Sequence, residues 1–430
     1  MGIERKPIKE YRNKIIYGSA LKILRKLPSN SVHCCITSPP YWGLRDYNTK
    51  PLIWDGKKGC KHKWGNFQKG RVTGKGNRPS DNKNKRIGKE FDSKEVRSFC
   101  QKCGAWKGSL GLEPTPELYI KHLVKIFRQV KRVLRKDGTL WLNIGDTYSR
   151  GDRKNVPTQR GLASSKSDKD KYLFDSPSAM MSNHETIKPK DLVGIPWMLA
   201  FALRDDGWYL RIEIIWSKPN PMPESVKDRP TKSHEFIFLL SKSGKYFYDA
   251  EAIKEQTKDW GLRDRKKGSA FVDGTPGRSK QSGGKDCNFA ERGRNKRSVW
   301  TVTTKPYKKA HFATFPTKLI KPIIKAGTSK YGVCKKCGTP YVRVLKVVDK
   351  VCNQFGERKN ITKTISWKKV CDCKTKKFIP AIILDPFGGS GTVAKVSKKY
   401  GRDFISIDLN KNYCEMQEDR IDREHTRLFI

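Results

Sequence analysis

Short apolar runs alternate with amphipathic stretches along much of the chain, most regularly at its two ends. Leu21, Leu24 and Leu27 recur at helical spacing, whereas the apolar runs on either side of them are only a few residues long. The pattern predicts strands at 14–18, 31–37, 139–146, 208–219 and 234–249, helices at 19–28, 116–138 and 192–207, and near the C-terminus a strand with a glycine-rich loop at 378–392, a helix at 393–401, a strand at 402–409 and a helix at 410–424. Strands that alternate with helices favour an α/β fold with a mostly parallel sheet.

Three segments interrupt this pattern and carry few apolar residues. Residues 57–102 hold 15 Lys and Arg against 4 Asp and Glu, and residues 254–297 hold 13 basic residues with scattered aromatics, namely Trp260, Phe271 and Phe289. Residues 150–190 are rich in Ser, Lys and Asp and show no periodicity. We interpret all three as insertions on the sheet scaffold that become ordered on binding.

Charge is the strongest global signal, since 91 Lys and Arg against 43 Asp and Glu give a net charge of +48. A field of this sign favours a nucleic acid as partner, because compositional bias toward lysine alone would raise Glu as well. No apolar run is long enough for a membrane span, and the polar N-terminus does not resemble a secretory signal. We expect a cytoplasmic protein, in a prokaryotic cell or a virus-infected host cell, whose 12 Cys are thiols or metal ligands.

A glycine-rich loop follows the apolar run near residue 384. Gly388, Gly389 and Gly391 precede a predicted helix, where glycine lets the backbone approach a ligand closely. Neither a phosphate-binding loop nor a dinucleotide fingerprint has this spacing. A nucleoside-type cofactor fits better, because Asp408 ends the next predicted strand and can accept from both hydroxyls of a ribose. The alternative is a tight strand-to-helix turn with Asp408 as a helix cap.

The stretch ITSPPYWGLRDY, residues 36–47, places two prolines directly after a predicted buried strand. Proline cannot donate to a sheet ladder and pushes the preceding residue away from helical geometry, so the chain must turn sharply at Thr37 and Ser38. The turn carries Tyr41 beyond the end of the sheet. An ordinary loop turn is the alternative for this motif taken alone.

Together, TSPPY (37–41) and DPFGGSGT (385–392) resemble the DNA amino-methyltransferases, which transfer a methyl group from S-adenosyl-L-methionine to N4 of cytosine or N6 of adenine. The stretches GLEPTPELYIKHL, GTLWLNIGDTY, WSKPNPMPESVKDRPTKSHEFIFLLSKS and AHFATFPTKLIKP are similar to the subgroup with zinc-ribbon insertions. The resemblance implies a Rossmann-like S-adenosylmethionine-dependent methyltransferase sheet, circularly permuted (β-class order), with zinc-ribbon and basic loop insertions. Such a sheet is complete only if strands from both ends of the chain pair side by side.

The resemblance also assigns roles to individual residues. The catalytic residues would be Ser38, Pro39, Pro40 and Tyr41: Ser38 and the Pro39 carbonyl accept from the target amino group, the prolines fix the geometry, and Tyr41 stacks on a base taken out of the duplex. The cofactor-binding residues would be Asp385, Pro386, Phe387, Gly388, Gly389, Ser390, Gly391, Thr392, Asp408, Phe315, Pro316 and Ser19. Core packing is the alternative for Phe315. Ser19 departs from the Asp that the family usually carries there. Ser38 in place of Asp predicts cytosine N4 as the target, with adenine N6 as the alternative.

The cysteines fall into two clusters with metal-ligand spacing: Cys60, His62, Cys100 and Cys103, and Cys334, Cys337, Cys371 and Cys373. In the second cluster two cysteine pairs bracket a β-like insertion, which is typical of a structural zinc ribbon. Four ligands with no open position predict structural Zn2+ at both clusters. Cys352 is an alternative ligand of the second cluster, Cys34 and Cys35 are assigned to the core, and Cys287 and Cys414 have no assigned partner.

These interpretations divide the chain into segments: the N-terminal part of the catalytic core (1–47), a basic zinc-binding insertion (48–112), the continued core (113–249), a target-recognition region (250–311), a segment that closes over the cofactor (312–333), a second zinc ribbon (334–376) and the cofactor-binding part of the core (377–430). We expect a monomer or homodimer that acts on double-stranded DNA, with a cognate restriction endonuclease as a further partner.

A zinc-ribbon DNA-binding protein with a vestigial methyltransferase core is the alternative from another class, and only Ser19 favours it. A protein glutamine methyltransferase fits Ser38 and the charge poorly, and RNA as substrate stays open.

Overall fold

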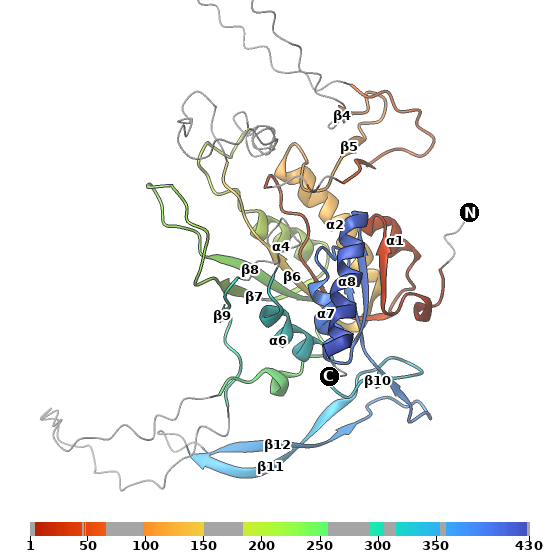
Figure 1. Cartoon of the computed structure of the whole chain (residues 1–430), viewed down its shortest axis with the longest axis vertical. Helices are drawn as coiled ribbons and strands as arrows, with labels where there is room; N and C mark the ends of the chain where they lie inside the picture. Colours follow the sequence, from red (N-terminus) through yellow and green to blue (C-terminus); the bar gives the residue numbers. More distant parts are fainter. Residues whose placement is uncertain are drawn as a thin grey trace, which may run out of the picture. The chain divides into compact units, whose positions relative to one another are not determined.

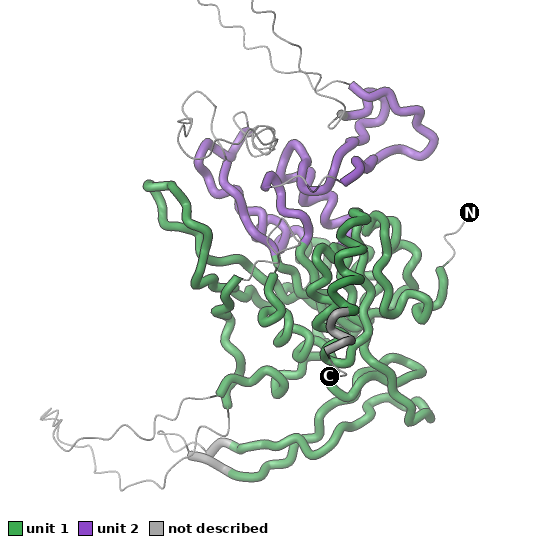
Figure 2. Tube along the Cα trace, in the orientation of Figure 1, with its two compact units in different colours: residues 1–38, 128–143, 203–430 green, residues 39–127, 144–202 purple. Residues whose placement is uncertain are grey.

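The computed structural model of the protein describes residues 5–44, 47, 49–65, 98–149, 184–256, 293–304, 315–352 and 358–427. The chain divides into two compact units, which Figure 2 shows in different colours. Unit 1 contains residues 1–38, 128–143 and 203–430, and unit 2 contains residues 39–127 and 144–202. Most of the predicted insertion at 150–190 and of the target-recognition region at 250–311 lies outside the described residues, as does Cys287.

Among the described residues, unit 1 is built on an eight-stranded sheet with the strand order β1-β15-β14-β2-β6-β8-β7-β9. The strands are β1 (Lys14–Tyr17), β2 (Val32–Thr37), β6 (Leu134–Ile144), β7 (Tyr209–Ser217), β8 (His234–Ser241), β9 (Val299–Thr301), β14 (Ile382–Asp385) and β15 (Asp403–Asp408). From β1 to β6 the pairs are parallel, whereas β7 and β8 are antiparallel. The predicted α/β class with a mostly parallel sheet is confirmed.

Strands from the two ends of the chain lie side by side in this sheet. β1 pairs with β15, where Tyr17 lies opposite Asp408, and β2 pairs with β14, where Cys35 lies opposite Leu384. The prediction that a permuted sheet closes through its two ends is therefore confirmed. Because these pairs are parallel, the carboxyl ends of β1, β15, β14 and β2 meet at one edge, which is where ligands bind in open α/β sheets.

In unit 1 the main sheet is packed against α1 (Ala20–Lys26), α6 (Thr317–Gly327), α7 (Thr392–Lys399) and α8 (Lys411–Arg427). Two further helices, α2 (Pro116–Val133) and α4 (Ile195–Asp205), have most of their residues in unit 2. Leu319 and Ile323 of α6 are buried in one cluster with Trp141 of β6 and Val393 of α7. Cys34 on β2 belongs to the same cluster, and burial raises the pKa of its thiol to about 12, so it is a core residue as predicted.

The predicted helix at 116–138 is too long, because α2 ends at Val133 and the chain continues directly into β6. Leu134 pairs with Val32 at the start of β2, and the carbonyl of Val133 accepts from the N–H of Ser31. The carbonyl of Val133 therefore bonds to the segment before β2, and Leu134 pairs with β2, instead of continuing the helix. The Asp-Gly pair at 137–138, interpreted as a helix stop, lies inside the strand.

Smaller β elements lie outside the main sheet. In unit 2, β3 (Leu52–Trp54), β5 (Trp106–Gly108) and β4 (Ser98–Phe99) form an antiparallel sheet in that order. In unit 1, β10 (Val333–Cys334) pairs with β13 (Phe378–Ile379), and β11 (Val342–Cys352) with β12 (Arg358–Lys368) as the long ribbon of Figure 1. No described helix combines the length and apolar character that crossing a bilayer requires.

Candidate active site and metal centres

The carboxyl end of β2 is joined to the start of the glycine-rich loop. Thr37, the last residue of β2, donates from its hydroxyl to Oδ1 of Asp385 at 2.7 Å. Both residues are buried, and the N–H of Phe387 donates to the same oxygen at 3.1 Å. Ser38 follows Thr37 directly and is therefore held beside the first residue of the loop that we predicted to bind a cofactor.

The loop between β14 and α7 is a set of tight backbone turns. The N–H of Gly388 donates to the carbonyl of Ile407 on β15, and that of Gly391 donates to the carbonyl of Gly388, both at 2.8 Å. A Cβ at Gly388 would lie 2.2 Å from Oγ of Ser406, and Gly391 has φ of +73°, so both positions require glycine. The other predicted residues of this loop are buried or half-buried: Pro386, Phe387, Gly389, Ser390 and Thr392.

Asp408 ends β15 and is fixed by backbone donors. Its Oδ2 accepts from the N–H of Gly389 at 2.7 Å and its Oδ1 from the N–H of Asn410 at 2.8 Å. Its carbonyl accepts from the N–H of Gly18 at 2.8 Å, which brings the start of α1 to the same place. Ser19, the N-cap of α1, makes no side-chain capping hydrogen bond there. The structure thus brings together Asp408, the glycine-rich loop and Ser19.

Both acids at this edge of the sheet are harder to ionise than free carboxyls. Burial, with a smaller contribution from the charge of Asp408, raises the pKa of Asp385 to about 7. Burial likewise raises the pKa of Asp408 to about 6. In the described part of the chain, Oδ2 of Asp385 is buried and has no hydrogen-bond partner. A positive charge bound nearby would stabilise both ionised carboxylates.

The proline turn from Pro39 onward belongs to unit 2, where a residue of α2 binds its backbone. The hydroxyl of Tyr119, a fully buried residue of α2, donates to the carbonyl of Pro40 at 2.7 Å. The ring of Tyr41 lies against Gly145, where a Cβ would come within 2.6 Å of Cε2. The backbone at 145 therefore leaves room for the aromatic ring that we predicted to stack on a base.

The predicted cofactor-closing residues lie at the start of α6 in unit 1. Pro316 is the N-cap of α6 and its carbonyl accepts from the N–H of Leu319. Phe315 is half-buried and packs against the cluster that contains Leu319 and Val393. Its contacts are those of the core-packing alternative, and the preceding residues 305–314 lie outside the described part of the chain.

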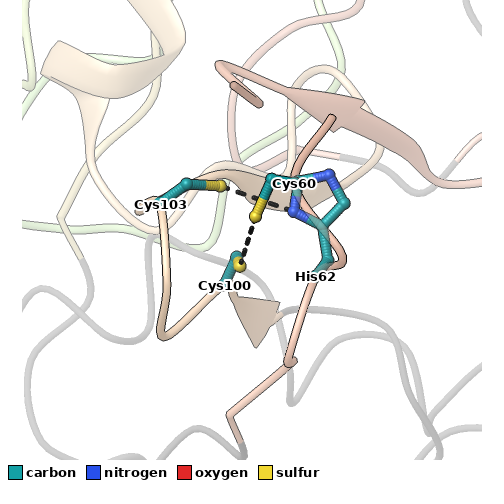
Figure 3. Close-up of side chains that lie close together, drawn as sticks. All are labelled: Cys60, His62, Cys100 and Cys103. Atoms are coloured by element: carbon teal, nitrogen blue, oxygen red, sulfur yellow. Dashed lines mark hydrogen bonds between the residues drawn. The ribbon is translucent and has the colours of Figure 1, made fainter. Parts of the chain in front are cut away.

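The first cysteine cluster, in unit 2, has the geometry of a tetrahedral metal site. Its four possible ligand atoms all lie within 4.8 Å of one another. Sγ of Cys60 lies 3.9 Å from Sγ of Cys100, and Sγ of Cys103 lies 3.4 Å from Nδ1 of His62. Figure 3 shows the four side chains pointing toward one another. A tetrahedron with Zn–S bonds of about 2.3 Å has edges of about 3.8 Å, so the site fits Zn2+.

The second cluster, in unit 1, brings together Cys334, Cys337, Cys371 and Cys373, again with all four sulfurs within 4.8 Å. The N–H of Gly338 donates to the carbonyl of Cys334 at 2.8 Å, which closes a tight knuckle between the first two cysteines. Four thiolates without an acid or an open position are a donor set for structural zinc. The side chain of the alternative ligand, Cys352, lies outside the description.

The chain matches a family model described as DNA methylase over residues 32–419. It belongs to this family. The type II methyltransferase M.Cfr9I of Citrobacter freundii is 35% identical over 412 residues, which cover 96% of this chain and 88% of that protein. M.SmaI of Serratia marcescens, another type II methyltransferase, is 34% identical over 408 residues, 95% of this chain and 90% of its own. The solved structure of the cytosine-N4-specific PvuII DNA methyltransferase matches 95% of this chain and 85% of its own, at 12% identity and a TM-score of 0.46.

Helix α8 of this DNA methylase supports the glycine-rich loop through residues that sequence reasoning missed. Nη1 of Arg420 donates to the carbonyl and the hydroxyl of Ser390, both at 2.8 Å, and to Oγ1 of Thr392 at 2.9 Å. Gln417 is fully buried, and its Oε1 accepts from Oγ of Ser406 at 2.6 Å. Neither residue has a signal in the sequence, because α8 is rich in charged side chains along its length.

Proposed function

We propose that this methyltransferase transfers a methyl group from S-adenosyl-L-methionine to N4 of a cytosine that has been taken out of double-stranded DNA. The observation that carries the proposal is the bond between Thr37 and Asp385, because it joins the strand that ends in the proline turn to the first residue of the glycine-rich loop. A net charge of +48 supports DNA as the substrate. Ser38 at the first position of the turn supports cytosine over adenine, as in the family that it resembles.

The turn would act through hydrogen-bond acceptors. The exocyclic amine of cytosine is a poor nucleophile because its lone pair is delocalised into the ring. The hydroxyl of Ser38 and the carbonyl of Pro39 would accept from its two N–H groups, which localises the lone pair and orients it toward the methyl donor. Both residues are fixed by the prolines, and Tyr41 offers a ring on which the base stacks. The nitrogen would carry a positive charge once methylated and would then release one proton to water, so the reaction needs no side chain as a strong base.

The two acids at the carboxyl ends of β14 and β15 would hold the cofactor. When bound, S-adenosyl-L-methionine supplies an electrophilic methyl group on a positively charged sulfur. Asp408 would accept from the ribose hydroxyls, and the backbone of Gly388 to Gly391 leaves room for a ligand close to the start of α7. The raised pKa of Asp385 and its unpaired buried oxygen, within the described residues, fit a cationic ligand.

Structural zinc in both cysteine clusters completes the proposal. The donor sets are one histidine with three cysteines in unit 2 and four cysteines in unit 1. Each cluster offers four ligands and so leaves no open position for a catalytic water, and metal binding would stabilise the folds of these small insertions.

The experiment that tests this function is the identification of the modified base. The purified protein is incubated with S-adenosyl-L-methionine and double-stranded DNA of diverse sequence, at low salt with zinc present, and the DNA is digested to nucleosides for mass spectrometry. We expect N4-methylcytosine. N6-methyladenine would keep the fold and the cofactor but contradict the role of Ser38 in base choice. No modified base would contradict the function and favour a DNA-binding protein without transferase activity.

A matched pair of variants locates the chemistry. Ser38→Ala removes the proposed acceptor and should lower kcat at least about a hundredfold, while affinity for S-adenosyl-L-methionine, measured by calorimetry, stays within about twofold. Ser31→Ala, at the other end of β2, changes the same residue type far from the turn and should keep wild-type kcat. Equal activity of the two variants would exclude Ser38 from the reaction.

A further inference from the structure

The segment that follows the first cysteine cluster continues to Gly111, which contacts the proline turn. Cys103 is three residues before Trp106, the first residue of β5, and the N–H of Cys100 donates to the carbonyl of Ala105 at 2.7 Å. Ala105 and Trp106 are both buried. Because so few residues separate the metal ligands from β5, the cluster fixes where this strand lies.

A buried histidine of α2 lies between two tryptophans of this small sheet. The imidazole of His122 stacks on Trp54 of β3, with ring centroids 4.5 Å apart, and on Trp106 of β5 at 5.5 Å. The planes are inclined by only 22° and 23°. His122 is fully buried, so the sheet and the helix share one aromatic stack. No element of the proposed chemistry uses this histidine.

A buried glutamate connects that histidine to the loop behind the turn. Nδ1 of His122 donates to Oε1 of Glu113 at 2.9 Å, and the N–H of Gly111 donates to Oε2 at 2.8 Å. The carbonyl of Glu113 accepts from Nε1 of Trp42 at 2.9 Å. Glu113 is fully buried. Its side chain thus binds His122, while its backbone carbonyl binds Trp42, which follows the prolines of the turn.

The loop around Gly111 is in direct contact with the turn. The N–H of Gly43 donates to the carbonyl of Gly111 at 2.9 Å. A Cβ at Gly111, where φ is +92°, would lie 3.2 Å from the carbonyl oxygen of Tyr41 and 3.3 Å from Cβ of Pro40. Residues 40–43 thus rest on a loop whose shape depends on the carboxyl group of Glu113.

We propose that Glu113 and His122 form a buried positioning pair that fixes the proline turn and connects it mechanically to the first cysteine cluster. The pair touches neither the base nor the cofactor and acts through Gly111 and Trp42. The inference rests on the proposed methyltransferase function only for its effect on rate, because the effect on the turn itself is measured independently. A change of about 1 Å in a reacting group costs about a hundredfold in rate, so a loosened turn is readily detected.

Two variants of His122 separate its hydrogen bond from its ring. His122→Phe keeps an aromatic ring between the tryptophans but removes the donor to Glu113, whereas His122→Asn places an amide donor near the position of Nδ1 and removes the ring. His184→Asn is the matched control, because His184 also contacts a glutamate of α2, at 3.2 Å from Oε1 of Glu117, but on the surface. The readouts are kcat, KM for S-adenosyl-L-methionine, and amide exchange of Gly43 by mass spectrometry.

We expect His122→Phe to lower kcat about tenfold and to speed exchange of the Gly43 amide about tenfold, with KM for S-adenosyl-L-methionine unchanged, as the loss of one buried hydrogen bond implies. His122→Asn should have a kcat and a Gly43 exchange rate close to those of the wild-type protein. His184→Asn should have wild-type values of both. If His122→Phe leaves kcat and Gly43 exchange at wild-type values, the proposal is wrong. If His122→Phe and His122→Asn lower kcat and speed Gly43 exchange to the same extent, the histidine ring only stabilises unit 2 and the positioning role is wrong.

The connection to the cluster is tested by combining variants. Cys103→Ser should also speed Gly43 exchange, and the double variant with His122→Phe should exchange no faster than the more affected single variant, because both changes break the same series of contacts. Additive effects on exchange would overturn the connection. If the wild-type protein modified no DNA at all, the proposed function would fail, while the exchange of Gly43 would still decide on the positioning pair.

Discussion

The two cysteine clusters are equally compact, each with four possible ligand atoms within 4.8 Å of one another, but they are joined to different parts of the molecule. The cluster in unit 2 leads within a few residues to Trp106, and from there through His122 and Glu113 to the proline turn. The cluster in unit 1 contacts the beginnings of strands instead. Nε2 of His33, near the start of β2, lies 3.0 Å from the carbonyl of Gly338 in the cysteine knuckle, and Nδ1 of His33 accepts from the N–H of Ile382, the first residue of β14.

The difference follows from the direction of the strands. Parallel strands carry their ligand-binding residues at the carboxyl ends, so an insertion before β14 lies at the opposite edge of the sheet from Asp385 and Asp408. An insertion after the proline turn packs on the segment that we propose takes part in the reaction. We therefore expect metal in unit 2 to control rate and metal in unit 1 to control stability.

Removing one buried ligand from each cluster gives the largest expected effect. Cys100→Ser and Cys334→Ser replace cysteines that are both almost fully buried, and each should lose one of two zinc ions per chain. Cys100→Ser should lower kcat about a hundredfold, because the turn loses its support. Cys334→Ser should lower Tm by at least about 10 °C yet keep kcat within about threefold at a temperature where it is folded. The checks are metal analysis, calorimetry and initial rates; equal losses of kcat would abolish the contrast between the clusters.

Adding a methyl group at Gly111 tests the contact between its loop and the turn. Gly111→Ala forces a side chain toward Tyr41 and Pro40 at positive φ, and we expect kcat to fall about tenfold and stability by about 2 kcal/mol. Gly104→Ala is the control, because Gly104 also has positive φ, +71°, but a Cβ there meets nothing within 4 Å. It should cost about 1 kcal/mol of stability and leave kcat unchanged. A drop in kcat for both variants would show that strain in the insertion, and not contact with the turn, sets the rate.

The histidine beside the second cluster makes a prediction about pH. Burial, and next the charge of Arg135, lower the pKa of His33 to about 4, below the usual 6.5 of the unfolded chain. The neutral ring is favoured in the folded state, so its stabilisation is present above pH 6.5 and is lost as the pH falls toward 4. Between pH 7.5 and 5.5 the wild-type protein should lose about 1 kcal/mol more stability than His33→Asn, with equal kcat. Denaturant unfolding at both pH values measures this, and parallel curves for the two proteins would contradict it.

Much of the unit 1 scaffold was predictable from the sequence because its signals are local. Short apolar runs identified the strands at both ends of the chain, and their pairing is confirmed by β1 beside β15 and β2 beside β14. The error at the end of α2 arose because helical spacing continues past Val133, whereas pairing of Leu134 with Val32 is a long-range contact. Periodicity cannot report a competition between a helix and a distant strand.

The residues of the candidate site also differ in whether a local sequence pattern indicates them. The glycines, Asp408 and the cysteine clusters could be predicted as candidates because their spacing reflects local chemistry. Arg420, Gln417 and the pair Glu113 and His122 were missed because their roles depend on partners far away in the chain or on burial. The sequence GLEPTPELYIKHL resembled the family, but nothing in it indicated that an acid and a histidine nine residues apart would be fully buried together.

The smallest expected effect concerns the far side of the His122 ring. Within the described residues, Nε2 of His122 has no hydrogen-bond partner, although Oδ2 of Asp55 lies 3.9 Å away. Asp55 is already paired with Lys121 and Lys125, both partly exposed, and such pairs contribute little. Asp55→Asn should therefore change kcat by less than about twofold, whereas the buried hydrogen bond on the other side of the ring should be worth about tenfold. A tenfold loss of kcat in Asp55→Asn would contradict this and would mean that support for the turn depends on the carboxylates of both Glu113 and Asp55.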